Sequence, residues 1–333
     1  MKLKLPKQVL QVLNYPMIFD LISILLVLLV TLAGHATQQM VVDGEPAWWV
    51  TGFNLSTLLA FASVFLFSGG IFILNQINHL EINAKRNKIS PIETGEVDSA
   101  VAKKIAVVAI IVGLAALLLF QKLLLVGLAV VMILFRGVVH NVLKISKKES
   151  GILWIIFNLV FAALLFIFGW MIKGGFNPGQ WQYFVPYLLQ SLSLLILIFL
   201  LNGNRLYKSY QDGEEIVHMG DRKFLIWFAS LLAAAAFYLG LKNNDPLISH
   251  SLLLSLVLYI ILVFKLNHLW IQRTVAYTIM FFVFFISSQY PWFFLLAVII
   301  YYLSKKYYHD KYGILFPNFG NIEETGVEND QVE

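Results

Sequence analysis

Apolar runs of about 20 residues recur along almost the whole sequence, and they limit what it can fold into. Hydrophobic residues make up 59% of the chain and charged residues 13%, which is typical of a polytopic membrane protein and not of a soluble domain. A bilayer offers no water to backbone groups, so a spanning segment must satisfy its own hydrogen bonds. Because the runs do not alternate apolar and polar residues, they predict helices and not barrel strands. We therefore expect an all-α membrane bundle.

The lengths of the apolar runs predict nine or ten membrane spans. The run at 270–304 decides between these numbers, because a single helix of that length would be about 50 Å long and the hydrocarbon core is about 30 Å thick. A Ser-Ser-Gln segment and Pro291 interrupt this run, so we divide it in two. The expected spans are 17–34, 51–75, 102–120, 122–138, 152–172, 182–202, 223–241, 247–265, 270–288 and 290–304.

The positions of the cations predict the orientation of the bundle. If the N-terminus is inside and the chain crosses ten times, all of the 24 lysines and arginines except Lys122, Lys173 and Lys242 lie on the inside. The positive-inside rule describes such a bias, and we therefore expect a cytoplasmic N-terminus. The sequence has no cysteine and no small-residue cleavage site after its first apolar run, which fits a bacterial inner-membrane protein with a retained first span.

Three segments differ in composition. Residues 1–16 mix Leu and Val with three lysines and predict a short interfacial helix. Residues 17–304 hold the spans and form the membrane domain. Residues 305–333 become acidic, lack apolar periodicity toward their end and predict a disordered cytoplasmic tail. We expect no nucleic-acid partner.

The stretch from Asn75 to Val97 is polar and basic, although it starts inside one apolar run and stops just before the next. On a helix Gln76, His79 and Asn83 would share one face, since their spacing is i, i+3 and i+7. Three cations follow, and a proline and a glycine then stop the helix and turn the chain. The cations are Lys85, Arg86 and Lys88. A polar stripe at the membrane edge backed by cations predicts a site for an anionic lipid head group or a phosphate.

This stretch resembles the first polar loop of the UbiA superfamily of intramembrane prenyltransferases. The family pattern is N-D-x-x-D-x-x-x-D, followed by basic residues, R-P-L and S-G. The matching positions, in the order of that pattern, are Asn75, Gln76, His79, Asn83, Lys85, Arg86, Pro91, Thr94 and Gly95. Ser90 stands where the family has the Arg before the Pro.

A second stretch, RLYKSYQDGEEIVHMG, resembles the second polar loop of the same family, which follows the sixth span. Asp212 and Gly220 match the Asp-rich pattern of that loop, whereas Arg205 stands where its first Asp belongs. Glu214 and Glu215 lie next to the matching Asp.

The resemblance extends over the order of the spans and the placement of the loops to about residue 270. Between the fourth and fifth spans, Lys144 and Asn158 also take matching places. The resemblance implies a UbiA-like arrangement of helices around a central cavity that opens to the cytoplasmic side. In the family, Mg²⁺ held between the two Asp clusters bridges a polyprenyl diphosphate and helps to expel pyrophosphate.

The departures from the family pattern weaken such a metal site. Mg²⁺ prefers hard, charged oxygen ligands. Gln76, His79 and Asn83 remove three negative charges from the first cluster, and a neutral imidazole is a poor ligand for Mg²⁺. Arg205 opposes a cation at the second loop. The same changes let basic residues, Lys144 among them, bind an anion directly, so no cofactor is expected.

Two functions stay open, and with them the question whether the protein is an enzyme. The first is a divergent UbiA-like protein that binds an isoprenoid or another anionic lipid without classical Mg²⁺-dependent prenyl transfer, and that belongs to a larger membrane complex. Its binding residues would be Asn75, Gln76, His79, Asn83, Lys85, Arg86, Lys88, Lys144 and Arg205. The second is an active prenyltransferase with an aromatic or lipid acceptor, using Mg²⁺. There Asp212, Glu214 and Glu215 would be catalytic, with Asp212 also a metal ligand.

Overall fold

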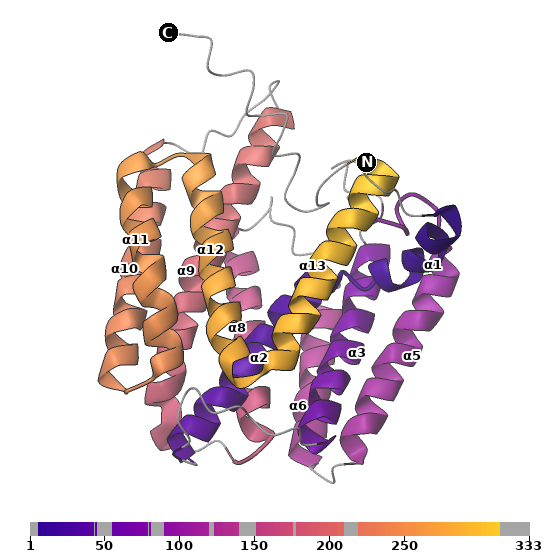
Figure 1. The fold of residues 1–333 in the computed structure, drawn as a ribbon, viewed down its shortest axis with the longest axis horizontal. Helices are drawn as coiled ribbons and strands as arrows, with labels where there is room; N and C mark the ends of the chain where they lie inside the picture. The colour runs from indigo at the N-terminus through magenta and orange to yellow at the C-terminus, as the bar shows by residue number, and fades with distance from the viewer. Residues whose placement is uncertain are drawn as a thin grey trace. The chain divides into compact units, whose positions relative to one another are not determined.

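The computed structural model describes residues 6–42, 44, 55–78, 80, 90–119, 123–139, 151–175, 178–209 and 219–313. Within these ranges the chain forms helices joined by turns, and no β-strand occurs in them, which confirms the predicted all-α class. The helices are α1 (Lys7–Met17), α2 (Leu21–Val42), α3 (Leu55–Asn78), α5 (Ser99–Leu118), α6 (Leu123–Ile133), the π-helix η1 (Leu134–Val139), α8 (Gly151–Met171), the 3-10 helix η2 (Pro178–Gln180), α9 (Trp181–Ser209), α10 (Met219–Lys242), α11 (Pro246–Lys265), α12 (His268–Gln289) and α13 (Pro291–Tyr312) (Figure 1).

Most predicted spans overlap these helices, although α2 begins at Leu21 and continues to Val42, well beyond the expected end at residue 34. Among the described residues, 8 helices are long and apolar enough to cross a membrane. They are α2, α3, α5, α8, α9, α10, α11 and α12. The expected fourth span forms a shorter apolar helix, Leu123–Gly137, that runs from α6 into η1. The run at 270–304 is divided as expected, because α12 ends at Gln289 and α13 begins at Pro291.

Contacts divide the chain into two compact units. Unit 1 comprises Met1–Leu28, Asn54–Asn141 and Leu295–Glu333, and unit 2 comprises Leu29–Phe53 and Val142–Phe294. Helices α2 and α13 each contribute residues to both units.

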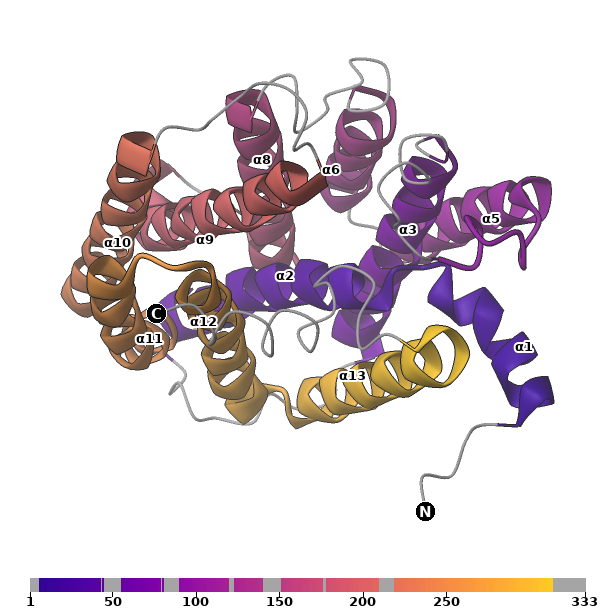
Figure 2. The ribbon, with the colours of Figure 1, turned by 90° about the horizontal axis from the view of Figure 1, so that it is seen from above.

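Four helices of unit 2, α9 to α12, form a closed ring. Each packs against the next, and α12 packs back against α9, as Figure 2 shows from above. Their apolar faces meet in one core, to which α10 contributes small side chains, Ala229 and Ala233. Polar groups also link these helices: Ser193 on α9 donates to the backbone oxygen of Ala229 and lies 2.9 Å from the Tyr259 hydroxyl on α11. Such links matter in lipid, where apolar burial alone gives helices little reason to associate.

Short capped turns connect the helices of this ring. Asp245 caps the N-terminus of α11, where Pro246 occupies the first turn, and Asn267 caps α12. Asn244 and Leu266 precede these caps with φ of 52° and 46°, a left-handed backbone that reverses the chain within a few residues. Caps followed directly by apolar residues explain why these helices begin where they do.

Helices α2 and α8 cross in unit 2 at two glycines. A Cβ atom at Gly34 would lie 2.0 Å from the carbonyl oxygen of Phe166, and one at Gly169 would lie 1.9 Å from that of Thr31. No real side chain fits at such distances, so the two backbones touch only because both positions lack one. This is the small-residue packing that membrane helices use for close approach.

Unit 1 is built around the antiparallel pair α3 and α5. Helix α6 and the segment η1 pack against this pair. Here too glycines allow the approach, since a Cβ at Gly70 would lie 2.6 Å from the carbonyl oxygen of Ala106. The η1 segment continues α6 as one wider turn that holds Arg136. Such π-helical turns often mark functional sites.

Helix α1 packs in unit 1 against the C-terminal part of α13. Met17 of α1 forms an apolar cluster with Tyr307 and Tyr308, while Val12 on the opposite face of α1 is 69% exposed. Helix α1 thus covers much of the segment 1–16, whose position at the membrane interface stays a prediction. Helix α13 continues to Tyr312, so residues 305–312 of the segment expected as a tail are helical. The rest of that segment, from residue 314, lies outside the described residues.

We expect Gly34→Ala and Gly169→Ala each to lower the stability of the protein by about 2 kcal/mol or more, because the added methyl group must push two backbones apart. The control is Gly127→Ala in α6, where a Cβ would meet nothing within 4 Å. That change replaces a poor helix former by a good one, and should leave stability unchanged or raise it by about 0.5 kcal/mol. Thermal unfolding in detergent micelles measures all three. Equal unfolding temperatures for Gly34→Ala and Gly127→Ala would show that α2 and α8 do not approach this closely.

Candidate lipid-binding site

The structure describes only part of the predicted site. Asn75 and Gln76 lie in the last turn of α3, the segment Pro91–Gly95 forms a turn, and Asn158 lies in α8. Arg205 lies in α9, but its side chain is not among those described. The predicted residues outside the described ranges are His79, Asn83, Lys85, Arg86, Lys88, Lys144, Asp212, Glu214 and Glu215.

Gln76 has a structural partner that the sequence did not reveal. Its side chain is 6% exposed, and its Nε2 donates to the backbone oxygen of Ile18 at 2.9 Å, which ties the end of α3 to the α1–α2 junction. Its Oε1 and the Oδ1 of Asn75 are buried and have no hydrogen-bond partner among the described residues. The end of α3 thus carries two buried acceptors that no donor in the described part of the chain satisfies.

The α1–α2 junction beside Gln76 is fixed by an acid. Asp20 has a φ of 50° and accepts hydrogen bonds from the backbone nitrogen and the hydroxyl of Ser23, so it caps the start of α2. An acid at the edge of the first span thus has a local structural role. Its carboxylate also lies near Tyr308, where burial, and then the charge of Asp20, raises the pKa of the Tyr308 hydroxyl above its ordinary value.

The turn that closes the first polar stretch forms as predicted. The backbone nitrogens of Glu96 and Val97 donate to the carbonyl oxygen of Pro91 at 2.9 and 3.0 Å. Gly95 has a φ of 75°, a conformation that favours glycine. Asp98 then caps α5 by accepting from two backbone nitrogens.

The end of α13 holds this turn through contacts that sequence reasoning missed. Lys311 forms an ion pair with Glu96 and donates to Asn14 of α1. The Tyr312 hydroxyl donates to Glu96 at 3.3 Å and lies 3.2 Å from the hydroxyl of Thr94. The i, i+4 spacing of Tyr307 and Lys311 was the available signal for one helical face in a segment expected to be a tail.

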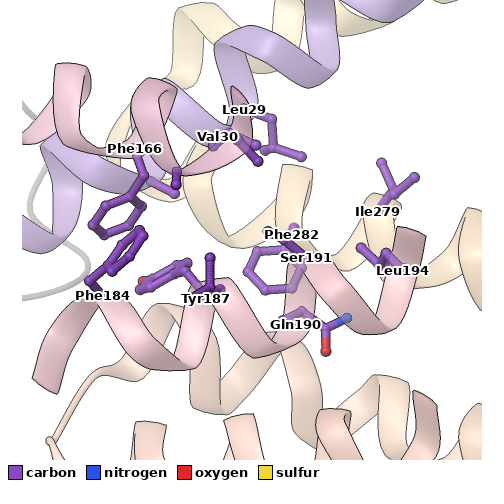
Figure 3. Close-up of a pocket in the computed structure, with 14 residues that line it drawn as sticks. Leu29, Val30, Phe166, Phe184, Tyr187, Gln190, Ser191, Leu194, Ile279 and Phe282 are labelled. Atoms are coloured by element: carbon purple, nitrogen blue, oxygen red, sulfur yellow. The ribbon is translucent and has the colours of Figure 1, made fainter. Parts of the chain in front are cut away.

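Unit 2 contains an apolar cavity of about 70 Å³. Helices α2, α8, α9 and α12 line it, and Figure 3 shows Phe166, Tyr187 and Phe282 arranged around it. Small residues make the space: Ala33 on α2 and Ala162 and Ala163 on α8 leave room where larger side chains would fill it. A cavity this size in an apolar wall suits part of a hydrocarbon chain better than water, which needs several polar partners.

One amide borders this cavity. Gln190 is 3% exposed, and its Nε2 donates to the Tyr259 hydroxyl on α11 at 3.3 Å. Its amide group is therefore turned toward α11, and its aliphatic part lines the cavity. The wall that faces the cavity is thus almost entirely carbon.

No protein-family model matches the sequence, and no curated protein matches it. A solved structure of digeranylgeranylglyceryl phosphate synthase in membranes is similar to this chain, with a TM-score of 0.58 and 18% sequence identity over 86% of this chain and 99% of that one. At this identity the likeness establishes the fold. It confirms the UbiA-like membrane fold that the two polar loops imply.

Proposed function

We propose that this chain is a divergent UbiA-like membrane protein that binds an isoprenoid or another anionic lipid without Mg²⁺-dependent prenyl transfer. The observation that carries the proposal is the apolar cavity of unit 2, which small residues on α2 and α8 keep open. An apolar hollow between helices costs stability when nothing fills it, because its walls lose contacts. A hydrocarbon chain supplied by the surrounding lipid is the natural occupant.

The polar end of the ligand is assigned from the sequence. Lys85, Arg86, Lys88, Lys144 and Arg205 remain the predicted phosphate ligands. The two unpartnered amide oxygens at the end of α3 are acceptors, so they suit the basic side chains of that loop as partners and not the phosphate itself. The cations of the loop would supply the charge that a phosphate requires.

The described donors do not fit the Mg²⁺ site of the family. Asn75 and Gln76 offer uncharged amide oxygens, and the side-chain nitrogen of Gln76 is already bonded to Ile18. Mg²⁺ between diphosphate groups relies on carboxylates for most of its protein ligands. In the ranges that the structure describes, no group of three or more His, Cys, Asp or Glu side chains could hold a metal ion. The acids that could hold a metal ion, Asp212, Glu214 and Glu215, lie outside these ranges.

A second candidate is an active prenyltransferase, which the fold likeness to a synthase favours. Its catalytic acids would be Asp212, Glu214 and Glu215, with Asp212 holding Mg²⁺. The acceptor would be an aromatic compound or a lipid. Both candidates share the inner-membrane location and the cytoplasmic N-terminus that the charge bias predicts.

Membership in a membrane complex is the remaining part of the proposal. It follows from a fold kept without its usual metal ligands, because such a protein can retain a binding role inside an assembly. Purification in a mild detergent tests it: a stoichiometric membrane partner supports a subunit role, and a monomer that binds lipid alone contradicts it.

Filling the cavity should weaken the binding of a hydrocarbon chain there. We expect Ala163→Phe to weaken the binding of tritiated geranylgeranyl diphosphate at least tenfold, about 1.4 kcal/mol, because its ring would occupy the space. The matched control is Ala276→Phe on α12, where the alanine is exposed on the bundle surface. Equal affinity of the two variants for the diphosphate would show that its hydrocarbon chain binds outside this cavity.

One assay with the same diphosphate distinguishes the lipid-binding protein from the active prenyltransferase. We expect EDTA to leave its affinity unchanged and Arg86→Ala to weaken it about tenfold, since a charge-assisted hydrogen bond contributes roughly 1.5–3 kcal/mol. Lys122→Ala, which removes a cation from the predicted opposite side, is the control and should bind like the unmodified protein. Pyrophosphate release that requires Mg²⁺ and disappears in Asp212→Ala would instead establish the prenyltransferase.

A further inference from the structure

A buried acid lies at the α10–α11 turn of unit 2, and the proposed function does not use it. Asp245 is 3% exposed, and its Oδ1 accepts hydrogen bonds from the backbone nitrogens of Leu247 and Ile248 at 3.1 and 3.4 Å. Its second oxygen, Oδ2, is also buried and makes no full hydrogen bond among the described residues. Oδ1 thus caps α11, whereas Oδ2 has no structural role in this cap.

The titratable group that faces this carboxyl is Tyr187 on α9. The ionisable residues nearest to it in sequence on α10 and α11, Lys242 and His250, are both exposed, and the ring of His250 bonds to the backbone oxygen of Pro246 instead. Within the described part of the chain no ion pair involves Asp245. An acid without a cation in such a place is costly to keep charged.

Tyr187 continues a chain of hydroxyl groups to α2. The Tyr187 hydroxyl lies 2.9 Å from the hydroxyl of Thr37, which lies 2.8 Å from the carbonyl oxygen of Ala33. All three residues belong to unit 2, as does Asp245. The Asp245 carboxyl thus lies within electrostatic reach of a hydroxyl pair that extends to the backbone of α2.

Counting hydrogens shows what this chain requires. Each hydroxyl carries one hydrogen, and a carbonyl oxygen can only accept. If Thr37 donates to Ala33, then Tyr187 must donate to Thr37, and only a protonated Asp245 can donate to Tyr187. If Asp245 is charged, Tyr187 turns its hydrogen to the carboxylate, Thr37 donates to Tyr187, and the carbonyl of Ala33 loses that donor. The hydrogen bonds from Asp245 to Tyr187, from Tyr187 to Thr37 and from Thr37 to the Ala33 carbonyl can therefore all form only when Asp245 is protonated.

We propose that Asp245 is a proton-binding site whose protonation reverses the direction of the hydrogen-bond chain through Tyr187 and Thr37 to α2. The bound species is one proton taken from the aqueous phase at the α10–α11 turn, and no other bond changes. Burial raises the pKa of Asp245 to about 6, which places its titration in mildly acidic solution.

The sign of the pH effect follows from linkage. The folded protein binds this proton more tightly than the unfolded chain, in which an Asp titrates near pH 4. The stabilisation from the neutral acid is therefore complete below about pH 4 and is lost as the pH rises through about 6. This is the reverse of the usual behaviour of a salt-bridged carboxylate.

The test uses the full chain in detergent micelles. We expect the unmodified protein to unfold about 2 °C higher at pH 5 than at pH 7.5. Asp245→Asn keeps a capping oxygen and places a permanent donor opposite Tyr187, so it should raise the unfolding temperature at pH 7.5 and remove most of this difference. The control is Asp98→Asn, which changes a cap of the same geometry on α5 but an exposed one, and should keep the difference.

Infrared difference spectroscopy gives a readout that does not depend on stability. The protonated carboxyl should give a carbonyl stretch that appears as the pH falls through about 6, is absent in Asp245→Asn and remains in Asp98→Asn. Tyr187→Phe removes the donor to the carboxylate, so the midpoint of this band should move to higher pH. A band that persists in Asp245→Asn, or a midpoint that Tyr187→Phe does not move, would overturn the proposal. So would an unchanged pH difference in the unfolding temperature of Asp245→Asn.

Discussion

Close backbone approach between α2 and α8 is the constraint on which much of unit 2 depends. In a bilayer, burial of apolar side chains does not drive helices together as it does in water, so contact distance and hydrogen bonds must do so. Gly34 and Gly169 let the two helices touch. This contact fixes α2 at a position where Ala33 borders the cavity and Thr37 reaches Tyr187. The cavity and the hydroxyl chain are thus two results of one crossing.

Polar side chains in the two units stabilise different kinds of contact. Unit 2 has neutral, deeply buried links between helices, such as the bonds that join Ser193 and Gln190 to Tyr259. In unit 1 the ion pair of Lys311 and Glu96 is partly exposed, and it joins segments that lie far apart in the sequence. Neutral links suit the apolar interior, where desolvation of a charge is costly, and charged links suit a helix end near water.

The sequence predicted the helices well because their cause is local. The length of the apolar runs, and their lack of alternating polar residues, predicted the spans. A single helix over 270–304 would be longer than the bilayer core is thick, which predicted the break before Pro291. Pro91 and Gly95 gave the turn, since their conformational preferences act wherever they occur. The order of the two polar loops gave the UbiA-like fold, which the similar solved structure confirms.

The site was harder to predict because its contacts are not local. Helical spacing put Gln76 on a ligand face, but no pattern indicated that its nitrogen would bond to Ile18. Lys311 and Tyr312 followed the last expected span and were assigned to a tail, although their partners lie more than two hundred positions earlier. Asp245 had the sequence of an ordinary cap, Asp-Pro, and only burial distinguishes it from Asp98. The side chains of the predicted cations are not among those described, so their roles remain predictions.

The paired glycines of α2 and α8 also restrict how this crossing could have arisen. A single glycine brings no benefit, because a methyl group on the other helix still holds the two backbones apart. A bundle with the first glycine alone would keep a wider crossing, so the tight approach needs both positions together.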